Sequence, residues 1–182
     1  MPRILTNILL FQLGWFACVL GGAYNYPLVG SLIAVMVITY HLFTTALWPR
    51  ELLLILVVML IGSIWDSFLV YQNWISYSSG QLFPGTAPYW IVIMWGLFTT
   101  TLNVSLKWLH KRLFYSICFG LVGGPLAYLA GSKLGALQFI DKQSGLIALA
   151  IGWGVITPLL LILSHYISIL GKNTQRKIPC KG

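Results

Sequence analysis

Six long apolar stretches constrain the fold of this chain more than any other feature of its sequence. Each is close to the roughly 20 residues that a helix needs to cross the hydrocarbon core of a bilayer. They do not alternate in polarity as membrane β-strands do, and in hydrocarbon the backbone must satisfy its own hydrogen bonds. The sequence therefore predicts an all-α, polytopic bundle of six transmembrane helices, at about 4–24, 27–47, 51–72, 88–108, 113–131 and 145–169.

The scarcity of charge supports the same interpretation. Only 8% of the 182 residues are charged and 58% are hydrophobic, whereas a soluble domain has about 25% charged residues. So few charges could not cover a surface that faces water. Because the connections are short, we expect residues 1–171 to form one six-helix transmembrane domain, followed by a basic tail at 172–182.

The basic residues are distributed unevenly over the connections. In a six-helix arrangement nine of the 11 Lys and Arg residues fall on one side, and only Lys133 and Lys142 fall on the other. The positive-inside rule then places both termini in the cytoplasm, with the tail against anionic headgroups. We expect no nucleic-acid partner, because the tail has no interleaved aromatic residues on which bases could stack.

Asp66, one of three acidic residues, lies within the third apolar stretch. A carboxylate in the membrane costs about 2.5 kcal/mol or more unless it faces a partner or a cavity, so Asp66 should face the bundle interior. Two interpretations carry equal weight, a general acid/base or proton site and a hydrogen-bonded structural acid. The candidate partners are Tyr128, Trp90, Trp95, Tyr24 and Tyr26, with Lys133 as the nearest basic residue.

A second polar cluster is expected near the other membrane surface. His41 and Glu51 form its most plausible acid/base couple. His41 and His165 fall at similar depth and could ligate a haem, but the small residues that would make room for a porphyrin are not arranged around both, so we expect no cofactor and no metal. The catalytic candidates are thus Asp66, His41 and Glu51, and the candidates for substrate binding are Asn7, Gln12, Trp95, Asn103 and Tyr128.

Two further patterns predict contacts with the surroundings. The uncharged connection at 73–88 is rich in aromatic residues, which predicts an interfacial belt on the membrane surface formed by Trp74, Tyr77, Phe83, Tyr89 and Trp90. The fifth stretch carries small residues four apart in two rows, Gly120 and Gly124 on one and Gly123, Ala127 and Gly131 on the other. This spacing lets helix backbones approach closely, so the glycine face of this helix would allow a homodimer.

Several of these residues stand in a pattern that resembles a family of small bacterial inner-membrane proteins known only as a domain of unknown function. The first half of the pattern comprises Asn7, Gln12, Trp15, His41 and the GSxxD of residues 62–66. The second half is a run from Trp95 to Leu109 and the string GGPLAYLAGSKLGA at 123–136, whose GGPLAY-x-AG part is the most specific. The resemblance extends over most of the chain.

The resemblance implies a multi-pass protein of the bacterial inner membrane, of a family often encoded near cyclopropane-fatty-acid-synthase-like enzymes. It thereby implies membrane lipids as ligands, lipid-modifying enzymes as partners, and a role in membrane-lipid modification or lipid binding. It supplies no catalytic residues. Two alternatives stay open, a small proton-coupled transporter, with Asp66 and the His41–Glu51 pair as protonatable stations, and a non-catalytic scaffold for partner enzymes.

Overall fold

The computed structural model describes residues 2–175, which form six helices and one two-stranded sheet. The predicted all-α class and six helices are confirmed. In chain order the elements are α1 (Pro2–Ala23), α2 (Pro27–Phe43), α3 (Trp48–Tyr71), β1 (Ile75–Tyr77), α4 (Tyr89–Leu102), a 3-10 turn (Lys107–Leu109), α5 (Leu113–Lys133), β2 (Leu137–Phe139) and α6 (Lys142–Gln175).

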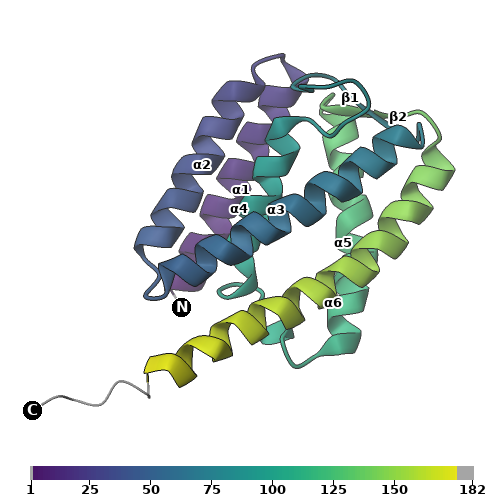
Figure 1. Ribbon diagram of the computed structural model, residues 1–182. Coiled ribbons are helices and arrows are strands. Elements are labelled where there is room, and N and C mark those ends of the chain that lie inside the picture. The colour runs from purple at the N-terminus through teal and green to yellow at the C-terminus, as the bar shows by residue number, and fades with distance from the viewer. Residues whose placement is uncertain (1, 176–182) are drawn as a thin grey trace, which may run out of the picture.

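The helices pack around α4, which contacts α1, α2, α3 and α6 (Figure 1). The pairs α1–α2 and α5–α6 have the most extensive contacts and lie on opposite sides of the bundle. Every residue of α4 from Trp95 to Leu102 is buried. The hydroxyls of Thr99, Thr100 and Thr101 donate to backbone carbonyls three or four residues earlier, so these polar side chains can lie inside the bundle.

The outer faces of the helices are apolar, as a lipid-facing surface requires. Leu9 on α1, Met36 on α2 and Leu60 on α3 are each at least 60% exposed. Four helices are long and apolar enough to cross a membrane, namely α1, α3, α5 and α6. This composition supports a multi-pass membrane protein. The side of the membrane on which the termini lie stays a prediction.

Two helices are shorter than predicted from the sequence. α2 has 17 residues instead of the expected 21, and α4 has 14, which at 1.5 Å per residue spans only about 21 Å. The backbone of α4 turns after Leu102, where Thr101 O accepts from the N–H groups of Val104 and Leu106. Apolar composition alone cannot distinguish a buried central helix from a full membrane span. The prediction of six full-length spans is therefore not confirmed.

α6 also differs from the expected range, because it continues to Gln175. Residues 172–175 of the predicted tail are therefore helical. Residues 176–182, which hold most of that tail, lie outside the described part of the chain.

A small antiparallel sheet joins the α3–α4 and α5–α6 connections at one end of the bundle. β1 follows α3 and β2 follows α5, and Tyr77 pairs with Leu137 at one end of their register. This pairing was not predicted, because three-residue strands carry no detectable periodicity in the sequence.

The sheet changes the role expected for the aromatic residues in and beside the connection at 73–88. Phe83 is 69% exposed, but Tyr77 and Trp90 are buried, so the predicted interfacial belt is wrong for these two residues. The side chain of Tyr77 turns inward to a carboxyl group, and Trp90 Nε1 donates to Ser79 O. Each polar group thereby finds a partner inside the protein, which favours burial over the interface.

Candidate functional site

Asp66 lies at the centre of the first polar cluster. It comes from the last third of α3, and its side chain is fully buried. Three side chains donate to it: Tyr77 and Tyr128 to Oδ1 at 2.5 and 2.6 Å, and Trp95 to Oδ2 at 2.6 Å. The carboxyl group thus joins four elements, α3, β1, α4 and α5.

The structure tests the contacts expected for Asp66. The inward orientation is confirmed, as are the contacts with Tyr128 and Trp95. Tyr24, Tyr26 and Trp90 do not bond to it: the first two are about 70% exposed, and Trp90 bonds to Ser79. Lys133 is also exposed, and no ion pair of Asp66 occurs among residues 2–175.

Sequence reasoning missed Tyr77 as a partner, although it lies only 11 residues from Asp66. The sequence contained two indications, a buried acid that needs hydrogen-bond donors and a tyrosine in the connection that follows it. Without the β1–β2 pairing, nothing in the sequence indicated that this tyrosine points inward.

Glycines create the space that positions Trp95. A Cβ atom on Gly62 would lie 2.1 Å from Trp95 Cγ, so the indole can pack against the backbone of α3 only because this position has no side chain. The other face of Trp95 stacks on Trp153 of α6, with ring centroids 4.6 Å apart and planes 12° apart. Gly124 makes room for the side chain of Trp153 in the same manner, and Gly120 lets the backbone of α6 approach at the Trp153 carbonyl.

The glycine face of α5 therefore divides into two rows with different surroundings. Gly120 and Gly124 contact α6 within the same chain, whereas Gly123, Ala127 and Gly131 have no such contact and line a cavity, whose wall Gly124 also reaches. A homodimer through this helix stays a prediction, and the second row is the one that it would use.

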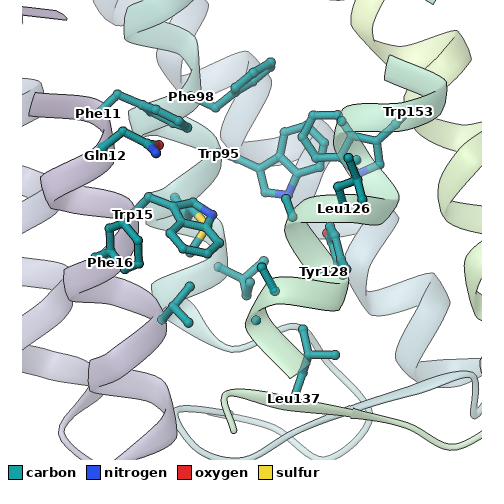
Figure 2. Close-up of a pocket in the computed structure, with 18 of the residues that line it drawn as sticks. Phe11, Gln12, Trp15, Phe16, Trp95, Phe98, Leu126, Tyr128, Leu137 and Trp153 are labelled. Atoms are coloured by element: carbon teal, nitrogen blue, oxygen red, sulfur yellow. The ribbon is translucent and has the colours of Figure 1, made fainter. Parts of the chain in front are cut away.

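That cavity is a cleft of about 470 Å³ between α1, α4 and α5, with Trp153 of α6 at its inner wall (Figure 2). Its lining is almost entirely apolar and aromatic. Trp95 and Tyr128 form part of the wall while their polar atoms bond to Asp66 behind it. Gln12 of α1 contributes the only side-chain amide of the lining. We call this cavity the aromatic cleft.

A second polar cluster lies at the other end of α3. Glu51 is in the first turn of that helix, as predicted, and accepts hydrogen bonds from His41 Nε2 of α2 and Asn103 Nδ2, each at 3.0 Å. Ser164 of α6 donates to Asn103 Oδ1 at 2.6 Å. The expected contact between His41 and Glu51 is thus present, whereas Ser164 was not foreseen.

The structure groups the candidate residues into two sets. Asp66, Trp95 and Tyr128 are in one hydrogen-bonded cluster, and His41, Glu51 and Asn103 are in the other. Gln12 lines the aromatic cleft, and Asn7 lies elsewhere, with its amide donating to Thr100 O. Their catalytic and substrate-binding roles stay predictions.

The histidines are not arranged for haem ligation. His41 bonds to Glu51, while His165 packs on His110 with ring centroids 5.6 Å apart. Partial burial lowers the pKa of His110, which favours its neutral form near the end of α4. Among the described residues, no group of three or more His, Cys, Asp or Glu side chains is placed to hold a metal ion.

The chain was also compared with known proteins. No curated protein and no solved structure matches it. Residues 4–159 match the family described as "Protein of unknown function (DUF2878)". This range includes the Asp66 cluster, the whole lining of the aromatic cleft, and His41, Glu51 and Asn103 of the second cluster. Because this match extends over most of the chain, the protein belongs to that family.

Proposed function

We propose that the protein binds the hydrocarbon chain of a membrane lipid in the aromatic cleft. The observation that carries this proposal is a cavity of about 470 Å³ with an almost wholly apolar lining, in a bundle whose outer faces are apolar. Its volume lies within the range of about 300–1,000 Å³ that is typical of ligand sites.

The chemistry of the lining selects against polar ligands. The polar atoms of Trp90, Trp95 and Tyr128 are used for bonds within the protein. Few polar groups of the lining are then left to a ligand, namely the amide of Gln12 and the indole N–H groups of Trp15 and Trp153. A polar solute that entered the cleft would lose its hydrogen bonds to water without replacement, which costs several kcal/mol per group. A hydrocarbon chain has no such penalty.

The geometry favours a positioning role for Asp66 over a catalytic one. Its carboxyl group is fully buried behind the cleft wall and accepts three hydrogen bonds, so it does not face a ligand in the cleft. It fixes the orientation of Trp95 and Tyr128, which do face the cleft. Of the interpretations open from the sequence, this arrangement supports lipid binding. A role in lipid modification would follow if the protein presents the bound hydrocarbon chain to a lipid-modifying enzyme.

Photocrosslinking would test the proposal directly. The full-length protein is reconstituted with phospholipids that carry a diazirine in the acyl chain, irradiated, and digested for mass spectrometry. We expect labels on residues of the cleft lining as well as on the lipid-facing surface of the bundle.

A matched pair of variants gives the control. Gly123→Leu should fill the cleft without a backbone clash, because a Cβ atom there meets only Phe119 Cε1 at 3.9 Å. Val122→Leu adds bulk at an exposed neighbouring position on the same helix. Labelling of the cleft should fall several-fold in Gly123→Leu alone, while labelling of the outer surface stays unchanged. Equal labelling of the cleft in both variants, or none in the wild type, would favour a scaffold or a transporter.

A further inference from the structure

A second cavity of about 310 Å³ lies between α1, α2 and the end of α4. Its wall from α1 includes Arg3 and Asn7, whereas the aromatic cleft uses Phe11, Trp15 and Val19 of the same helix. The two cavities share no lining residue and use successive stretches of α1, residues 3–10 and 11–19, so they are separate. Seven of its ten lining residues have polar side chains, and the lining comprises Arg3, Thr6, Asn7, Leu10, Val37, Tyr40, His41, Thr44, Thr100 and Val104.

Asn7 gives this cavity an acceptor that lacks a donor. Its Nδ2 donates to Thr100 O at 3.1 Å, and since a carbonyl can only accept, this bond fixes the orientation of the amide. Asn7 Oδ1 is buried and has no hydrogen-bond partner among residues 2–175. An unpaired buried acceptor is unfavourable, so a group that donates a hydrogen bond would gain by binding here.

His41 and Thr44 add to the same acceptor character. Glu51 Oε1 engages Nε2 of His41, and in the tautomer that donates from Nε2, Nδ1 is the acceptor that the ring offers. Thr44 uses its hydroxyl hydrogen to bond to His41 O, which leaves the lone pairs of its oxygen. Arg3, which is exposed, is the only cation of the lining.

We propose that this cavity binds a phosphate ester that also bears a hydroxyl or primary ammonium group. The donor group would reach Asn7 Oδ1 and His41 Nδ1, and the phosphate would pair with Arg3. Such a ligand is found both in the headgroups of glycerol and ethanolamine phospholipids and in soluble esters of the same composition. Choline esters meet the phosphate requirement but lack a donor, so the cavity should discriminate against them. The proposal does not depend on lipid binding in the aromatic cleft.

Binding to the full-length protein in detergent can be measured by native mass spectrometry, with ethanolamine, glycerol and choline phospholipids of identical acyl chains. We expect the first two to bind about tenfold more tightly than the choline lipid, as one unpaired buried acceptor would give. Phosphoethanolamine and glycerol 3-phosphate form a second arm. If these esters displace the lipid at concentrations close to the Kd of the lipid, the ligand is a soluble ester. If they displace it only at much higher concentrations, the ligand is the lipid.

Three variants assign the effect to this cavity. Asn7→Leu should abolish the preference over choline lipid, and Arg3→Gln, at an exposed position, should weaken the binding of all three lipids equally. Gln12→Leu alters the aromatic cleft only and should leave the preference unchanged. Equal binding of choline and ethanolamine lipids to the wild type, or a preference that persists in Asn7→Leu, would overturn the proposal. Neither result would bear on the crosslinking in the aromatic cleft.

Discussion

The two tyrosine hydroxyls that meet on Asp66 should be strongly coupled in their effect on stability. Tyr77 and Tyr128 donate to the same oxygen, Oδ1, at 2.5 and 2.6 Å. Substitution of either residue by Phe removes a hydroxyl and leaves the ring in place, while the other hydroxyl still satisfies Oδ1. Hydrogen bonds between membrane helices contribute about 0.6 kcal/mol on average, so each single variant should lose about 0.6–1 kcal/mol of unfolding free energy.

The double variant removes both donors from Oδ1. An acceptor left unpaired in a fully buried position costs about 1–3 kcal/mol beyond the lost bonds. We therefore expect the combined loss to exceed the sum of the single losses by about 1–3 kcal/mol, within the range seen for residues that share one network. The coupling arises because one acceptor serves two donors.

The free energy of unfolding can be measured on the purified protein in mixed micelles, with SDS as the denaturant and tryptophan fluorescence as the signal. Tyr71→Phe is a suitable control, because Tyr71 is 77% exposed near the end of α3 and its hydroxyl should contribute nothing. If the double variant equals the sum of the singles within about 0.5 kcal/mol, the shared-acceptor argument is refuted.

Two further predictions follow from the backbone and from a helix cap. Gly62→Ala should destabilise the protein by about 1–3 kcal/mol, because its Cβ would displace Trp95, whereas Gly123→Ala should be neutral or stabilising by up to about 1 kcal/mol; both are measured by the same titration. At the start of α6, hydrogen bonds from Ser144 lower the pKa of Asp141, so its stabilising effect is present above about pH 4 and is lost as the pH falls through the lowered value. Asp141→Asn keeps a capping residue and should remove this component of the acid dependence of the melting temperature, which a pH series of melting curves would show.

The sequence was sufficient to predict the contacts that depend on depth and polarity. A carboxylate within an apolar helix must face inward, and residues at matching depth on other helices are its natural partners, which identified Tyr128 and Trp95 for Asp66. The same reasoning paired His41 with Glu51, since both lie near one end of their helices. The roles of these residues in binding or chemistry are a separate matter, which contact geometry leaves as predictions.

The contacts that sequence reasoning missed depend on pairing between distant segments. Tyr77 points to Asp66 because β1 is in register with β2, 60 residues later in the chain, and no local pattern encodes that register. Ser164 was missed for a similar reason, since its position relative to Asn103 depends on the packing of α6. The short α4 escaped detection because a helix surrounded by other helices is as apolar as one that faces lipid.

The two carboxyl side chains of α3 together explain how a helix as short as α4 is held in the bundle. Apolar contact gives little net attraction between helices in a membrane, because lipid tails are as apolar as the side chains, so specific polar contacts acquire more weight. Glu51 and Asp66 are 15 residues apart, or about 22 Å along the helix axis. Asp66 bonds to Trp95, near the middle of α4, and Glu51 bonds to Asn103, immediately after its end. These two bonds fix the height and rotation of α4 against α3, and Trp95 thereby also sets the wall of the aromatic cleft. Asp66 and Glu51 each link three or more segments of the chain, and Asp66 thereby determines the shape of the cavity that we propose as the binding site.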